Sequence, residues 1–162
     1  MFTEENLRKV EAIKSRYPNQ MAALLPVLWL AQEQFGWISE EVMRYVAGLL
    51  DVPFSHVSGV VTFYTMFNKK PVGRYHIQIC ANISCMLRGS DNLVEHLERK
   101  LGIKAGETTP DKIFTLDEVE CLGSCGTAPM MQVNDDYYEN LDAAKVDQLL
   151  AGFRNNKQDS KS

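Results

Sequence analysis

Residues 75–85, YHIQICANISC, place two cysteines at the end of a segment in which apolar and polar residues alternate. This alternation is typical of a half-buried β-strand, so the segment predicts a strand from Tyr75 to Cys80. Cys85 follows after four intervening residues. The strand therefore delivers one thiol to a loop that carries a second.

A second pair of cysteines follows a second predicted strand, which covers Ile113 to Glu120. In the motif CLGSCG, Cys121 and Cys125 are separated by three residues. Each pair lies where a strand gives way to a loop, so we expect both pairs to meet at the same end of one sheet. We do not expect disulfides among these four cysteines, because the cytoplasm keeps thiols reduced.

Four converging thiolates predict a site for a soft metal: zinc, copper(I) or an iron–sulfur cluster. Structural zinc sites usually have two residues between paired cysteines, whereas wider spacings suit the larger binuclear 2Fe-2S cluster. Gly123 and Gly126 allow backbone amides to turn toward the sulfurs. The spacing favours a 2Fe-2S cluster on Cys80, Cys85, Cys121 and Cys125, and a structural zinc scaffold remains the alternative.

A free-standing thiol oxidoreductase is a third hypothesis. Such enzymes usually carry C-x-x-C at a helix N-terminus, and neither pair has that spacing. Glu118 and Glu120 would disfavour a free thiolate, and the same charges would lower the reduction potential of a cluster.

The three histidines are not expected to be ligands, because none lies within a cysteine loop. His76 precedes Cys80 by four residues, about 13 Å along a strand. His56 and His96 fall in predicted helices, where packing or surface positions explain them.

Residues 1–71 predict a four-helix region. Pro26 must either kink the second helix or lie in its first turn, because proline cannot donate an interior hydrogen bond. The polar segment Asn68–Gly73 is the expected boundary. The four predicted helices are one capped by Thr3 and ended at Tyr17–Asn19, one from about Gln20 to Phe35, one capped by Ser39 and running to Leu50, and one over residues 54–63.

Residues 72–162 predict the order strand, helix, strand, strand, strand, helix. The helix between the first two strands should cover about residues 89–100, followed by a loop over 102–112. A hairpin is expected over 130–138, and the last helix should be capped by Asp142. The residues after Phe153 predict a mobile polar tail. The fold class is therefore α+β, with a helical N-terminal region before an α/β region.

Composition excludes several classes of protein. The 162 residues are 45% hydrophobic and 23% charged, which is typical of a globular protein. A net charge of −4 disfavours a nucleic-acid binder. The longest apolar run, Met21–Ala31, is shorter than the roughly 20 residues that span a bilayer, so we expect no membrane insertion. The acidic N-terminus lacks the pattern of a secretion signal and predicts a cytoplasmic protein.

Five motifs in the same order resemble the family of small binuclear iron–sulfur subunits of NADH-quinone oxidoreductase, respiratory complex I, which are its E-type subunits. They are LLPVLWLAQEQFGWIS, GVVTFYTMF, C-x4-C, CLGSCGTAP and VNDDYYENLDAAKVDQLL. The resemblance covers nearly the whole chain. It implies an N-terminal helical bundle joined to a thioredoxin-like domain, with one 2Fe-2S cluster on Cys80, Cys85, Cys121 and Cys125.

The resemblance also implies a partner, an F-type flavoprotein subunit that holds FMN and binds NADH. The two would form a heterodimer in a larger complex, peripheral on the cytoplasmic side of the inner membrane. This chain has no G-x-G-x-x-G motif and is expected to bind neither FMN nor NADH, and to hold no catalytic residues of its own. Related subunits of NAD-linked hydrogenases and formate dehydrogenases are the alternative hosts.

Overall fold

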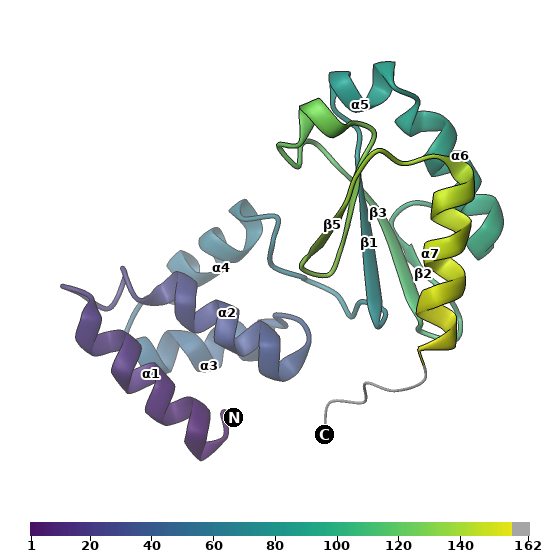
Figure 1. Cartoon of the computed structure of the whole chain (residues 1–162). Helices are drawn as coiled ribbons and strands as arrows, with labels where there is room; N and C mark the ends of the chain where they lie inside the picture. The colour runs from purple at the N-terminus through teal and green to yellow at the C-terminus, as the bar shows by residue number, and fades with distance from the viewer. Residues whose placement is uncertain (157–162) are drawn as a thin grey trace. The chain divides into compact units, whose positions relative to one another are not determined.

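The structure is a computed structural model that describes residues 1–156, and it divides into two compact units, Met1–Pro71 and Val72–Ser162 (Figure 1). The first unit contains helices only, and the second contains a mixed sheet with helices. This order confirms the expected α+β class. The expected mobile tail lies mostly in residues 157–162, which are outside the described residues.

The first unit contains the four predicted helices. Thr3 accepts a hydrogen bond from the Asn6 N–H and Ser39 accepts one from the Val42 N–H, so both predicted N-caps are confirmed. The helices are α1 (Glu4–Arg16), α2 (Leu24–Phe35), α3 (Glu40–Leu50) and α4 (Phe54–Phe63).

The second helix begins later than the predicted Gln20. Asn19 accepts a hydrogen bond from the Ala22 N–H in a turn before α2, and the helix itself starts at Leu24. Pro26 therefore lies in the first turn, where its missing N–H leaves no bond unmade. The kink that was the other possibility does not form. The predicted end at Gly36 is confirmed, with a left-handed φ of 80°.

Apolar side chains from all four helices form one core in this unit. Val10, Leu28, Val46 and Val57 are completely buried within it. The chain after α4 returns to α2, where the Gln32 side chain bonds the Met66 carbonyl and the Asn68 N–H. Because helices of this length are marginal alone, this shared core stabilises them.

The second unit is built on a five-stranded sheet with the order β2-β3-β1-β4-β5. Only β1 and β3 are parallel, and the remaining pairs are antiparallel. The strands are β1 (Tyr75–Cys80), β2 (Glu107–Thr108), β3 (Phe114–Val119), β4 (Met131–Val133) and β5 (Asp136–Tyr138). The bounds of β1 are those predicted from its alternation.

One face of this sheet packs against two helices, α6 (Ser90–Leu101) and α7 (Ala143–Asn155). Ile77 and Leu116 of the sheet share a buried core with Leu97 of α6 and Val146 of α7. The two helices lie side by side on the same side of the strands (Figure 1). The sheet therefore buries the apolar face of each of these helices.

Three local features differ from the sequence-based expectations. A short helix, α5 (Ile83–Leu87), lies in the first cysteine loop, where no helix was predicted. Strand β2 lies within the predicted loop 102–112, because its two residues pair with β3. Helix α7 continues to Asn155, two residues past Phe153, after which the polar tail was predicted.

Candidate metal centre

The two cysteine pairs lie at the same end of the parallel strands β1 and β3. Cys80 is the last residue of β1 and is paired with Val119, the last residue of β3, so Cys121 follows two residues beyond that pair. Cys85 lies in α5, and Cys125 begins a short 3-10 helix, η1 (Cys125–Thr127). The ends of α5 and η1 are both at the top of the sheet in Figure 1.

The first pair is buried and the second pair is exposed. Cys80 and Cys85 have exposed fractions of 3% and 2%, whereas Cys121 and Cys125 lie on the surface. Ala128 and Met130 pack against the buried pair in a small apolar cluster, with Leu122 at its edge. Apolar side chains therefore exclude water from the inner side of the site, and its outer side is open.

Hydrogen bonds and charge connect all four thiols. Burial opposes ionisation of Cys80, but N–H groups of Asn82 and Leu122 and thiols of Cys85 and Cys121 hold its pKa below the usual value. Burial raises the pKa of Cys85, and the neighbouring Cys80 and Cys125 add to that effect. The two loops thus supply backbone donors as well as sulfurs to one place.

These thiols are a suitable donor set for an iron–sulfur cluster. All four cysteines are free, and an all-sulfur set is what such clusters bind. Within residues 1–156, no three His, Cys, Asp or Glu side chains are arranged to hold a metal ion. A cluster of two bridged irons takes its thiolates around an extended object rather than at one point.

The two histidines of the second unit pair with carboxylates rather than with the thiols. His76 Nε2 is 2.6 Å from Asp117 Oδ2, and His96 Nε2 is 2.8 Å from Asp147 Oδ1. His56 is in α4, in the other unit. The two histidines that are nearest to the cysteines in the sequence, His76 and His96, therefore each have a carboxylate partner.

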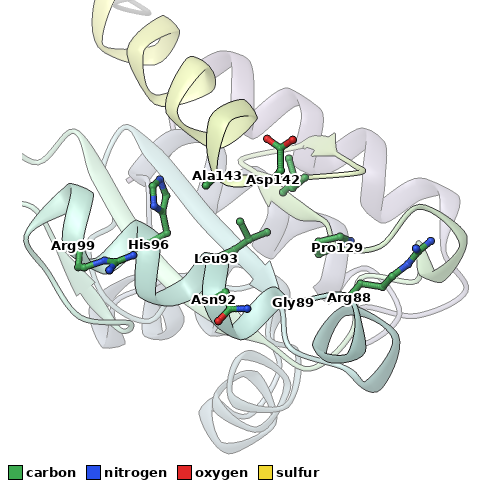
Figure 2. Close-up of a pocket in the computed structure, with 10 residues that line it drawn as sticks. Arg88, Gly89, Asn92, Leu93, His96, Arg99, Pro129, Asp142 and Ala143 are labelled. Carbon is green, nitrogen blue, oxygen red and sulfur yellow. The ribbon is translucent and has the colours of Figure 1, made fainter.

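A surface pocket of about 360 Å³ lies between α6 and the start of α7 (Figure 2). Arg88 and Arg99 lie at opposite ends of its lining, and Asp142 lies at the start of α7, where its carboxylate accepts from the Lys145 N–H. None of the ten residues that line this pocket is a cysteine.

Sequence reasoning missed three parts of the site. Asn82, which caps α5 through its side chain, is a local signal that could have indicated that helix. Met130 follows the second cysteine loop in the sequence, and it is completely buried against Cys80 and Cys85. The side chain of Glu139 forms hydrogen bonds with Ser124 and Thr127 in the second cysteine loop. Glu139 follows these residues by 15 and 12 positions, and no sequence signal links residues so far apart.

Comparison with known proteins shows which family the chain belongs to. The family model described as thioredoxin-like [2Fe-2S] ferredoxin matches residues 10–154. The chain is 51% identical over 146 residues to the E 2 subunit of NADH-quinone oxidoreductase from Rhizobium meliloti (strain 1021), covering 90% of this chain and 87% of that protein. It is 48% identical over 157 residues to the E subunit of NADH-quinone oxidoreductase from Rickettsia prowazekii (strain Madrid E), covering 95% and 89%.

Among solved structures, a chain of the NAD+-reducing [NiFe]-hydrogenase in the air-oxidized state has a similar fold. The TM-score is 0.71 at 24% sequence identity, over 81% of this chain. The chain covers 22% of the length of that hydrogenase chain. At this identity the likeness concerns the fold.

Proposed function

Because the chain belongs to the thioredoxin-like [2Fe-2S] ferredoxin family, we propose that Cys80, Cys85, Cys121 and Cys125 hold its 2Fe-2S cluster. The single observation that carries this proposal is that two loops bring four free thiols together at one end of the parallel strands. We also propose that residues 1–71 and 72–162 are the two domains of the chain, which is where the compact units divide.

The protein is an electron-transfer subunit of an NADH-quinone oxidoreductase, as its relatives are the E subunits of that complex. A bound 2Fe-2S cluster takes up and releases one electron at a time. The chain's own residues bind and tune it. The backbone N–H groups of Asn82 and Leu122 lower the pKa of Cys80, which favours the negatively charged ligand, and Met130 keeps water from the buried side.

A flavoprotein subunit that holds FMN and binds NADH is the partner we propose for the exposed side of the site. Cys121 and Cys125 are on the surface, so a partner can approach them without rearrangement of the buried pair. The apolar side chains Ile83 and Leu87 of α5 are 64% and 79% exposed beside the other loop. Exposed apolar groups of this kind are typical of a surface that a partner covers.

We place the protein at the cytoplasmic face of the membrane, as a peripheral part of its complex. No helix among the described residues is long and apolar enough to cross a bilayer. The proposal rests on the relationship to NADH-quinone oxidoreductase subunits, and fractionation of cells with and without the membrane part of the complex tests it.

Metal analysis of the anaerobically purified full-length chain tests the cluster. We expect iron and acid-labile sulfide in equal amounts and a paramagnetic signal only after reduction. Cys85→Ser should lose most of the iron, whereas Ser84→Ala, in the same loop, should keep it. One zinc per chain without sulfide would support the structural scaffold instead. Metal-free protein with disulfide reductase activity would support the thiol oxidoreductase.

The host complex is tested by co-purification. The native, untagged protein should bring down an FMN-containing NADH dehydrogenase subunit together with quinone-reducing activity. A hydrogenase or formate dehydrogenase module in its place would assign the chain to one of the alternative hosts.

A further inference from the structure

The segment 137–140 holds the second cysteine loop at three points, and we call it the 137–140 clamp. The Tyr137 hydroxyl donates to the Leu122 carbonyl at 2.9 Å. The Glu139 carboxylate accepts from the hydroxyls of Ser124 and of Thr127, the latter at 2.6 Å. The Asn140 N–H donates to the Thr127 carbonyl at 2.7 Å. These contacts span the loop that contains Cys121 and Cys125.

The clamp follows from the geometry of β5 and the chain after it. Successive strand side chains point to opposite faces, so Tyr137 and Glu139 reach the same side. Asn140 then turns the chain with a left-handed φ of 50°, a conformation that asparagine tolerates. The Glu139 carbonyl accepts from Lys145 of α7 at 2.5 Å, and the Leu141 N–H donates to the Pro129 carbonyl at 3.0 Å. The clamp is therefore held by α7 and by Pro129, which follows the second cysteine loop.

Glu139 is the central contact of this clamp. Its side chain is half-buried, and hydrogen bonds from Ser124 and Thr127 lower its pKa, so it is ionised at neutral pH. The two hydroxyl oxygens lie 2.7 Å apart. An ionised carboxylate accepts from both hydroxyls at once, and hydrogen bonds to a charged acceptor are stronger than neutral ones.

We propose that Glu139 is a positioning residue for the iron–sulfur centre: it fixes the loop around Cys125 through Ser124 and Thr127, and its charge lowers the reduction potential. Ser124 immediately precedes Cys125 and Thr127 follows it by two residues, so the carboxylate restrains the backbone on both sides of that cysteine. A fixed negative charge near the site opposes the addition of an electron. This inference rests on the proposed function, since it concerns the same four cysteines.

Two substitutions separate the restraint from the charge. Glu139→Gln keeps an oxygen that accepts from both hydroxyls but removes the charge, so iron release to a chelator should stay within about threefold of wild type. Its reduction potential should shift to a more positive value. Glu139→Ala removes both, and we expect iron release to be at least about tenfold faster, equivalent to about 1.4 kcal/mol. The paramagnetic spectrum of the reduced Glu139→Ala protein should broaden or shift.

Asp135→Asn is the matched control for charge. Asp135 lies in the turn of the same hairpin, beside Asn134, whose N–H bonds the His76 carbonyl. His76 is about 13 Å along β1 from Cys80. We expect Asp135→Asn to shift the potential less than Glu139→Gln does and to leave iron release and the spectrum unchanged.

Thr127→Val is a second test, in case Glu139→Ala does not fold. It deletes one donor to the carboxylate at nearly constant volume, and we expect iron release about threefold faster with unchanged circular dichroism. All measurements use the full-length chain with its cluster. Equal iron release, spectra and potentials for wild type, Glu139→Gln and Thr127→Val would overturn the proposal, as would equal potential shifts for Glu139→Gln and Asp135→Asn.

Failure of this inference can be told apart from failure of the proposed function. Wild-type protein that lacks iron and sulfide would contradict the proposed function. Wild-type protein that holds a normal cluster, with variants that behave identically, would contradict only the role of Glu139.

Discussion

Substitution of Gly73 by alanine should destabilise the sheet that carries the cysteines. Gly73 is buried just before β1, and a Cβ at this position would lie 2.7 Å from the carbonyl carbon of Phe114 and 2.9 Å from its nitrogen. Both atoms belong to the backbone of β3, so no side chain can move aside. The strands β1 and β3 must separate at their first residue pair, Tyr75 and Phe114.

The expected decrease in the free energy of unfolding of Gly73→Ala has two causes. Overpacking of a buried position typically lowers the free energy of unfolding by about 1–3 kcal/mol. The Gly73 N–H also donates to Thr115 Oγ1 at 2.6 Å, and Thr115 is completely buried. Loss of that hydrogen bond adds about 0.5–1.5 kcal/mol. Gly73→Ala should therefore lower the free energy of unfolding of the second unit by about 2–4 kcal/mol.

Hydrogen exchange of individual peptides is the suitable assay, because the chain has two units that need not unfold together. Peptides from β1 and β3 should exchange faster in Gly73→Ala. Both tryptophans, Trp29 and Trp37, belong to the first unit, so their fluorescence is an internal reference that should not change.

Gly152→Ala is the matched control. Gly152 lies in α7 of the same unit, and a Cβ there would meet nothing within 4 Å. Alanine is favoured over glycine inside a helix, so this variant should be stabilised by up to about 1 kcal/mol. If Gly73→Ala stayed within about 0.5 kcal/mol of wild type, the argument from the close approach of β3 would be wrong.

Three further predictions concern the second unit, each measured by urea unfolding. Ser90 is completely buried and its hydroxyl has no hydrogen-bond partner among residues 1–156, so Ser90→Ala should raise the free energy of unfolding by about 1 kcal/mol; a loss would show that the hydroxyl is satisfied in solution. The Lys100 ammonium, 2.8 Å away, holds the pKa of Asp147 below its usual value. The ionised form is thus favoured by folding, and its stabilisation begins to be lost as pH falls below about 4, so Asp147→Asn should differ from wild type at pH 6, and this difference should shrink as the pH is lowered further. Leu97→Ala, at a completely buried position, should cost about 2–5 kcal/mol, whereas Leu87→Ala, at a residue 79% exposed, should cost less than about 0.5 kcal/mol; similar losses would contradict the burial argument.

Local signals predicted most of the elements. The N-caps at Thr3 and Ser39 and the alternation of β1 were correct, because each depends on neighbours within a few residues. The start of α2 was wrong by four residues, because the turn at Asn19 competes with the helix for the same backbone groups. Strand β2 was missed because its two residues have no pattern of their own and are extended only through pairing with β3.

The candidate site, too, was predicted only in part from the sequence. The spacing of the cysteines, with strands before each pair, predicted that both pairs meet at one end of a sheet, since parallel strands end on the same side. Spacing could not predict which thiols are buried. Cys85 is enclosed because α5 turns it toward Met130, and that contact joins residues far apart in the chain.

The sequence alone determined most of the elements and the candidate ligands of a soft metal, because these depend on short-range periodicity and on side-chain chemistry. Only the tertiary structure decided which groups surround those residues. The contacts of Glu139 with Ser124 and Thr127 exist because β5 pairs with β4, and β4 with β1, in one particular register. Register is set by packing of the whole sheet against α6 and α7, so no local segment of the chain encodes it.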